Sequence, residues 1–201
     1  MDKWYYISQE YHLQNIQNVC EAGIRLVQLR AKNLKGQELL ELALAAQQIC
    51  KTHQATFIIN DHVALAKEIH ADGVHLGQND ISPIEARELL APHQIIGGTA
   101  NTFEDCKKLI AQKVDYIGLG PFRYTTTKKN LSPILGLEGY QSIVSKLKHA
   151  GATTPIYAIG GITQADFNDL LKTNIYGIAI SGLISHQSPE SIKDILAIPT
   201  L

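Results

Sequence analysis

Short apolar segments and longer amphipathic segments alternate along the whole chain of 201 residues, and this alternation constrains the fold more than any other feature. The short segments are rich in the β-branched and aromatic residues that favour strands, and the longer ones repeat apolar residues at the i, i+3, i+4 spacing of helices. The expected strands are Trp4–Ser8, Leu26–Arg30, Thr56–Asn60, Gly73–Gly77, Ile95–Thr99, Tyr116–Gly120, Ile156–Gly160 and Tyr176–Ser181. Strict alternation of this kind predicts parallel strands joined by helical crossovers.

Helix start signals precede several of the amphipathic segments, at Ser82-Pro83, at Asn101-Thr102 and at Thr163. The expected helices include Gln37–Thr52, Pro83–Leu90, Phe103–Gln112 and Ala165–Lys172. Eight strand–helix units fill the chain and no change in composition marks a boundary, so we expect a single domain over residues 1–201.

Polar residues at the strand ends favour a closed barrel over an open, doubly wound sheet. An open sheet binds its ligand mainly at one switch point, whereas a (β/α)8 barrel brings the carboxyl ends of all its strands to one rim. Nearly every expected strand ends in a residue suited to binding, among them Arg30, Asn60, Thr99 and Ser181. We therefore predict an α/β fold, a compact (β/α)8 TIM barrel whose mouth carries the functional residues.

Composition excludes several classes of protein. The chain has 18 basic and 19 acidic residues and a net charge of −1, which is unlike a module that binds nucleic acid over a broad face. No apolar run approaches the roughly 20 residues of a membrane span, and the first residues lack the apolar core of a signal peptide. The three cysteines have no metal-site or redox-motif spacing, so we expect them to be buried in helices. We expect a cytoplasmic protein with no nucleic-acid or membrane partner, and leave a homo-oligomer open.

The first candidate for binding chemistry is the polar strand end Gln28-Leu29-Arg30-Ala31-Lys32. Side chains alternate between the two faces of a strand, so Gln28, Arg30 and Lys32 share one face. The outer face of a barrel strand packs against helices and must be apolar, which directs Gln28 and Arg30 into the mouth. A guanidinium buried there needs an anion as its partner. Taken alone, the segment fits a charged surface loop equally well.

Two aspartates end neighbouring expected strands. Asp61 follows the third strand and Asp80 follows the fourth, so the barrel would bring their carboxylates together. Adjacent carboxylates repel each other, and a hard cation such as Mg2+ relieves that repulsion. The alternative is that each aspartate caps a helix or builds a turn.

Two further loops are suited to phosphate. The loop after the sixth strand carries Thr125, Thr126, Thr127 and Lys128, whose hydroxyl and ammonium groups suit phosphate oxygens. Glycines such as Gly161 after the seventh strand let backbone amides approach an oxyanion, and phosphate sites recur at this place in barrels. The alternatives are a solvated polar turn for the first loop and glycines required only by tight turns for the second.

The interior of the predicted barrel combines small residues with one histidine. His75 lies in mid-strand between two apolar residues and is expected to be a buried, hydrogen-bonded core residue rather than a catalyst. Some of the small residues near the carboxyl ends of strands must face inward and are expected to leave space for a ligand; the small residues are Gly97, Gly118, Gly120, Ala158, Gly160, Gly177 and Ala179. No arrangement for a serine or cysteine nucleophile is present, so covalent catalysis is not expected.

Taken in order, these segments resemble the thiamine phosphate synthase family, also called thiamine-phosphate pyrophosphorylase. The resemblance extends from about Tyr5 to Leu183 and implies a compact (β/α)8 barrel. The family's motifs stand here as Gln28-x-Arg30-x-Lys32, Asn60-Asp61, Gly73-Val74-His75-Leu76-Gly77-Gln78-x-Asp80, Gly118-Leu119-Gly120-Pro121, Thr125-x-Thr127-Lys128, Ile159-Gly160-Gly161-Ile162 and Ile180-Ser181.

The resemblance implies a transferase that joins hydroxymethylpyrimidine diphosphate to thiazole phosphate and releases thiamine phosphate and pyrophosphate. By the matching positions, Arg30, Lys32 and Lys128 would be catalytic because they neutralise the departing pyrophosphate, and Asp61 and Asp80 would hold the cofactor Mg2+. The pyrimidine diphosphate would be held by Gln28, Leu29, Arg30, Ala31, Lys32, Asn60, Thr99 and Lys128. The thiazole phosphate would be held by Thr125, Thr126, Thr127, Gly161, Ile180 and Ser181.

Three other functions remain alternatives, one of which is a generic phosphosugar isomerase, against which the absence of a well-placed acid/base pair counts. A related thiazole tautomerase uses the same barrel but carries a histidine where this chain has Pro121, and it lacks much of the diphosphate-binding set. A non-catalytic phosphate-binding barrel would keep the glycine and serine loops, with no reason to keep both Asp61 and Asp80.

Overall fold

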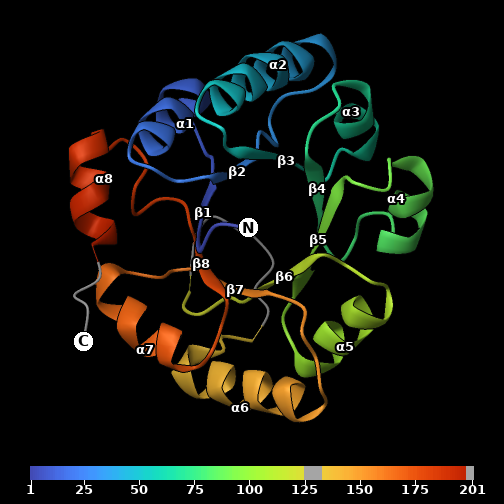
Figure 1. The fold of residues 1–201 in the computed structure, drawn as a ribbon, viewed down its shortest axis with the longest axis vertical. Coiled ribbons are helices and arrows are strands. Elements are labelled where there is room, and N and C mark those ends of the chain that lie inside the picture. The colour runs from blue at the N-terminus through green and yellow to red at the C-terminus, as the bar shows by residue number, and fades with distance from the viewer. Residues whose placement is uncertain (125–132, 198–201) are drawn as a thin grey trace.

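The computed structural model describes residues 1–124 and 133–197, and within these residues eight parallel strands close into one barrel surrounded by helices (Figure 1). Each strand pairs with its neighbour in sequence, and β1 completes the barrel by pairing with β8. The strands are β1 (Trp4–Ile7), β2 (Leu26–Leu29), β3 (Thr56–Asn60), β4 (Gly73–Leu76), β5 (Ile95–Ala100), β6 (Tyr116–Leu119), β7 (Ile156–Ile159) and β8 (Gly177–Ile180). The predicted (β/α)8 barrel is confirmed.

The helices form the outer ring of the barrel in chain order (Figure 1). They are α1 (His12–Glu21), α2 (Gly36–Thr52), α3 (Val63–Glu68), α4 (Pro83–Leu89), α5 (Phe103–Ala111), α6 (Gly136–His149), α7 (Phe167–Lys172) and α8 (Pro189–Leu196), with the 3-10 turn η1 (Gln164–Asp166) before α7. Over the described ranges, none of these helices has the length and hydropathy needed to cross a membrane.

Capping residues explain where two of the predicted helices begin. Ser82 and Glu85 form a capping box at α4, with Glu85 N donating to Ser82 Oγ over 3.2 Å and Ser82 N donating to the Glu85 carboxylate over 2.9 Å. Thr102 and Asp105 form the same box at α5. The predicted segment Ala165–Lys172 begins instead as the turn η1, because the carboxylate of Asp166 binds the backbone and hydroxyl of Thr163.

Several strands end one residue earlier than expected. Ser8, Arg30 and Gly77 are each the first residue beyond a strand, although the N–H of Ser8 still donates to the carbonyl of Gln28 over 2.9 Å.

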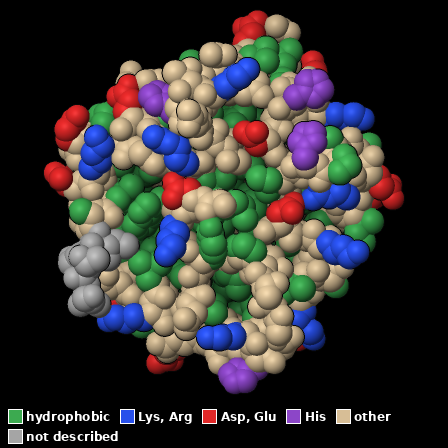
Figure 2. Space-filling view, in the orientation of Figure 1, with side chains coloured by type: hydrophobic (Ala, Val, Ile, Leu, Met, Phe, Trp, Pro, Cys, Tyr) green, Lys and Arg blue, Asp and Glu red, His purple; other side chains and the backbone are tan. Residues whose placement is uncertain are grey.

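Alternation along the strands separates an outer core, between strands and helices, from an inner core, inside the barrel. The outer core contains residues such as Val27, Ile59 and Ile178, and also the buried cysteines Cys20 and Cys50. The inner core consists of Tyr5, Ile7, Leu26, Ile58, Tyr116, Tyr157 and Ala179. Cys106 is buried as well, so the expected burial of all three cysteines is confirmed. On the face seen in Figure 2, hydrophobic side chains gather toward the middle and most charged ones spread around the edge.

Tyrosine rings occupy the space beside two of the small residues in the barrel interior. A Cβ on Gly97 would lie 2.1 Å from Cζ of Tyr116, and a Cβ on Gly177 would lie 2.7 Å from Cε1 of Tyr157. Ala158 faces the outer core. At the two glycines the missing side chains make room for aromatic rings, so Gly97, Gly177 and Ala158 are not among the small residues that leave space for a ligand.

Candidate active site

The first predicted binding residues lie at the end of β2, at the mouth of the barrel, where the carboxyl ends of the strands meet. Gln28 is 1% exposed inside the barrel, and Arg30, just past the strand, is half-buried and donates its backbone N–H to Ser8 Oγ over 3.1 Å. Leu29 and Ala31 point the opposite way, into the outer core. The alternation predicted for this segment is confirmed, and it leaves Leu29 and Ala31 only backbone atoms to offer a ligand.

The two predicted carboxylates lie side by side at the ends of β3 and β4. The backbone of Asp61 has φ +62° and donates its N–H to the carbonyl of His75 over 2.9 Å, while Asp80 Oδ2 accepts the N–H of Gly77 over 2.6 Å. Burial raises the pKa of Asp80, and a side-chain hydrogen bond with Asp61 raises it further. A cation bound between the two carboxylates would relieve the repulsion between their negative charges.

Two cationic side chains border this carboxylate pair. Lys32 Nζ lies 3.2 Å from Asp61 Oδ2. Burial lowers the pKa of Arg30, and the negative charge of Asp61 opposes that effect. This corner of the mouth therefore places two positive groups beside two carboxyl groups.

The carboxylate pair fits Mg2+ by its chemistry. Mg2+ prefers oxygen ligands and binds through one or two carboxylates, completing its shell with water and substrate phosphates. The described part of the chain has no group of three or more histidine, cysteine, aspartate or glutamate residues placed to hold a metal. Asp61 and Asp80 would thus suit a site that is completed by a bound diphosphate.

A chain of hydrogen bonds links the mouth to the inner core. Gln28 Nε2 donates to the hydroxyl of Tyr5 over 2.5 Å, and the hydroxyls of Tyr5 and Tyr116 are 2.6 Å apart. His75 joins Tyr116 to Thr99, with Nδ1 3.0 Å from the phenol oxygen and Nε2 2.9 Å from Thr99 Oγ1. The expectation that His75 is a buried, hydrogen-bonded histidine is confirmed.

Asn60 also lies at the mouth. It is the last residue of β3 and is 8% exposed, and strand alternation turns its side chain to the interior, as for Ile58. It pairs with His75 on β4, and because Leu29 pairs with Ile59, the residue level with Asn60 on the β2 side is Arg30.

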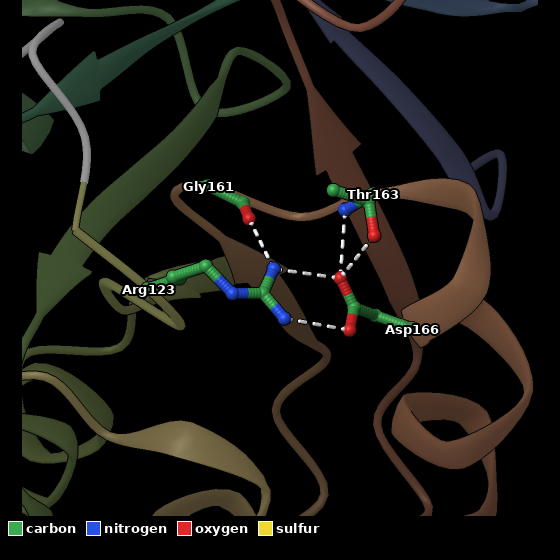
Figure 3. Close-up of polar contacts among 4 residues, drawn as sticks. All are labelled: Arg123, Gly161, Thr163 and Asp166. Carbon is green, nitrogen blue, oxygen red and sulfur yellow. Dashed lines mark hydrogen bonds and ion pairs between the residues drawn. The ribbon is translucent and has the colours of Figure 1, made fainter.

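An arginine–aspartate pair on the opposite side of the mouth holds the glycine loop (Figure 3). Arg123 donates from both terminal nitrogens to the carboxylate of Asp166, over 2.8 and 2.9 Å, and also to the carbonyl of Gly161 over 2.7 Å. The guanidinium keeps the pKa of Asp166 well below its usual range, and the contact with Thr163 acts in the same direction. The sequence signal for Asp166 is its spacing from Thr163, typical of a capping box, but nothing in the sequence identifies Arg123 as its partner.

The glycine loop itself requires residues without a side chain. Gly160 has φ +96° and Gly161 has φ +68°, and a Cβ on Gly161 would lie 2.9 Å from the carbonyl oxygen of Tyr124. These positions satisfy the conditions for tight turns, and they leave the phosphate role of Gly161 a prediction.

Two other residues predicted to bind phosphate lie at the end of β8, and the side chains of both are already engaged elsewhere. Ser181 Oγ donates to the carbonyl of Ile7 over 2.7 Å, so its hydroxyl hydrogen ties β8 to β1. The side chain of Ile180 lies in the outer core. Each therefore offers a phosphate its backbone rather than its side chain.

Four predicted residues, Thr125, Thr126, Thr127 and Lys128, lie outside the described residues. Two surface grooves lie elsewhere on the molecule, one of about 560 Å3 beside the end of α6 and one of about 470 Å3 beside α1. Neither groove is lined by a predicted site residue.

Comparison with known proteins identifies the family. The chain matches the family described as thiamine monophosphate synthase over residues 3–184. The thiamine-phosphate synthase of Flavobacterium psychrophilum is 50% identical over 188 residues, which cover 92% of this chain and 91% of that protein. The thiamine-phosphate synthase of Bacteroides fragilis is 47% identical over 183 residues, which cover 91% of this chain and 89% of that protein.

Solved structures agree with this match. The thiamine phosphate pyrophosphorylase from Pyrococcus furiosus has a TM-score of 0.84 at 27% identity, and the alignment covers 97% of each chain. At 16% identity and a TM-score of 0.67, a thiamine phosphate pyrophosphorylase from Bacteroides thetaiotaomicron shares the fold. The resemblance noted in the sequence motifs is confirmed. The chain belongs to the thiamine monophosphate synthase family, whose members are transferases of thiamine biosynthesis.

Proposed function

We propose that the chain joins a hydroxymethylpyrimidine diphosphate to a thiazole phosphate and releases thiamine phosphate and pyrophosphate, with Mg2+ as the cofactor. The observation that carries this proposal is the pairing of Asp61 with Asp80 beside Lys32 and Arg30. A diphosphate bound with a magnesium ion presents both negative oxygens and a cation, and this corner offers partners for both. A phosphate without a metal would have no use for the two carboxylates.

The bond changes require little of the protein beyond placement and charge. The bond between the pyrimidine methylene carbon and the diphosphate oxygen breaks, and both of its electrons leave with pyrophosphate. The lone pair of the thiazole ring nitrogen forms the new bond to that carbon, so no general base is needed. Mg2+ bound by Asp61 and Asp80 would supply positive charge to the leaving group.

The chain's own residues account for the remaining requirements. Arg30 and Lys32 lie where they could neutralise charge on departing oxygens, and Lys32 also balances Asp61. Gln28 and Asn60 are buried on the inner side of the barrel and Thr99 is half-buried, and the three would orient the pyrimidine portion. The turn at Gly161, held by Arg123, would receive the thiazole phosphate on backbone amides.

The experiment is a two-substrate assay of pyrophosphate and thiamine phosphate, run with Mg2+ and with a chelator. Asp80→Asn should lower turnover by about 100-fold or more, which corresponds to about 2.7 kcal/mol of transition-state stabilisation. Asp169→Asn is the matched control, because Asp169 forms an exposed ion pair with Lys172 on α7, away from the mouth. Its activity should equal that of the wild type.

Other outcomes distinguish the alternatives. Conversion of one thiazole phosphate isomer into another, without pyrophosphate release, would support a tautomerase instead. Tight binding of the substrates with no product under any condition would support a non-catalytic phosphate-binding barrel. Full activity with the chelator present would exclude the role of Asp61 and Asp80 as ligands of an essential metal.

A further inference from the structure

The hydrogen atoms in the buried chain from Gln28 to Thr99 can be placed by matching donors with acceptors. The amide nitrogen of Gln28 has hydrogens but no lone pair to offer, so it donates to the hydroxyl of Tyr5. Burial raises the pKa of both Tyr5 and Tyr116, so both phenols keep their hydrogens. A buried hydroxyl hydrogen needs an acceptor, and among the described residues the one in reach of Tyr5 is the oxygen of Tyr116.

The same matching determines the state of His75. Because Tyr116 accepts from Tyr5, its own hydrogen must go to its other partner, Nδ1 of His75. Nδ1 is then an acceptor, and the ring carries its hydrogen on Nε2, which donates to Thr99 Oγ1. Thr99 accepts this bond from inside the barrel, so its own hydroxyl hydrogen is left to point into the mouth.

The composition of the inner core supports a role for the two phenol groups. Barrel interiors are filled mainly by valine, isoleucine and leucine, which need no hydrogen-bond partners. Here Tyr5 and Tyr116 are fully buried, and Gly97 leaves space for the ring of Tyr116. Phenylalanine would fill nearly the same volume. What the two hydroxyl groups add is the series of hydrogen bonds from Gln28 to Thr99, with its defined donor-to-acceptor direction.

We propose that Tyr5 and Tyr116 are positioning residues whose hydroxyl groups hold His75 as the Nε2–H tautomer and thereby make Thr99 a hydrogen-bond donor toward the substrate. The inference rests on the proposed function, because oxygens of a bound diphosphate accept hydrogen bonds and do not donate them. At the other end of the chain, the orientation of the Gln28 amide turns its oxygen away from Tyr5. The mouth therefore meets a donor at Thr99.

The reversed arrangement is a defined competitor. If the side-chain amide of Gln28 were flipped, so that its oxygen and nitrogen exchanged places, every hydrogen bond from Gln28 to Thr99 would change direction. His75 would then carry its hydrogen on Nδ1, and the hydroxyl of Thr99 would donate its hydrogen bond to Nε2 of His75. The two arrangements therefore differ in the tautomer of a single histidine, which can be measured directly.

The test is nitrogen-15 NMR of the protein labelled at histidine, recorded near neutral pH without substrate. The signals of His75 are assigned by their loss in His75→Gln. We expect the wild type to show the Nε2–H tautomer, whereas Tyr5→Phe should show a mixture of tautomers because the direction of the chain is no longer imposed. Tyr157→Phe is the matched control, since Tyr157 packs against both rings but donates its hydroxyl to the carbonyl of Asp2.

Kinetics provide the second measurement. Tyr5→Phe and Tyr116→Phe should each lower kcat/KM for the pyrimidine diphosphate by about 2- to 10-fold, the worth of one hydrogen bond, and leave KM for the thiazole phosphate unchanged. Tyr157→Phe should retain wild-type kinetics.

An Nδ1–H tautomer in the wild type, or the same histidine spectrum in Tyr5→Phe as in the wild type, would overturn the inference. These spectra need no turnover, so they remain informative if the two-substrate assay fails and the proposed function is wrong.

Discussion

Replacing Gly97 in β5 with alanine would place a methyl group where the ring of Tyr116 now lies. An ideal Cβ at Gly97 falls 2.1 Å from Cζ and 2.5 Å from the hydroxyl oxygen of Tyr116. Carbon atoms in contact need about 3.5 Å, so the ring must retreat by about 1.4 Å. That movement would break the bonds of the hydroxyl to Tyr5 and His75, which are now 2.6 and 3.0 Å long.

The expected loss of stability follows from these two effects, the displaced ring and the broken hydrogen bonds. Overpacking of a core costs about 1–3 kcal/mol, and each buried hydrogen bond that is lost adds about 1 kcal/mol. We therefore expect Gly97→Ala to lower the free energy of unfolding by about 3–5 kcal/mol. For a chain of this size, each kcal/mol lowers Tm by about 2–4 °C, so Tm should fall by about 6–20 °C.

The assay is equilibrium unfolding in urea, followed by circular dichroism, with Gly118→Ala as the control. A Cβ on Gly118 would lie 3.2 Å from Cε1 of His75, so a shift of a few tenths of an ångström accommodates it. Gly118→Ala should cost less than about 1 kcal/mol. If Gly97→Ala is equally mild and its m-value is unchanged, the ring of Tyr116 does not fill the space beside Gly97, and the reasoning is wrong.

The remaining predictions concern pH. Arg123 keeps the pKa of Asp166 low in the folded chain, so Asp166→Asn should cost about 1–2 kcal/mol at neutral pH, and urea unfolding should show this difference shrinking as the pH falls below about 4. The pKa of Asp80 is raised instead, so without metal its contribution to stability should fall as the pH rises through that raised pKa. Mg2+, which competes with the proton, should raise Tm more on the alkaline side of this pKa, and Asp80→Asn should abolish both effects in a thermal melt.

The sequence predicts well what depends on periodicity. Alternation in β2 correctly turns Gln28 inward and Leu29 outward, and the barrel topology that follows from strand–helix alternation brings Asp61 and Asp80 together. A capping pattern that ends at Asp166 is also visible as a local spacing.

What the sequence does not predict depends on contacts between distant side chains. Arg123 and Asp166 are 43 residues apart, and no local pattern relates them. Alternation places Tyr116 inside the barrel but cannot say that its ring fills the space beside Gly97 or that its hydroxyl meets Tyr5. The volume left for a ligand could not be predicted from small residues alone, because large residues on other strands compete for the same space.

Pairing of β1 with β8 has a consequence during synthesis of the chain. Tyr5 pairs with Ala179, and Ser181 bonds to Ile7 across a separation of 174 residues. A ribosome adds about 5–20 residues per second, so β1 must wait about 10–35 s for its final partner. Throughout that interval the unfinished sheet has two open edges, and open edges are templates for pairing with other nascent chains. Translation speed ahead of β8 should therefore influence how much of the newly made protein escapes aggregation.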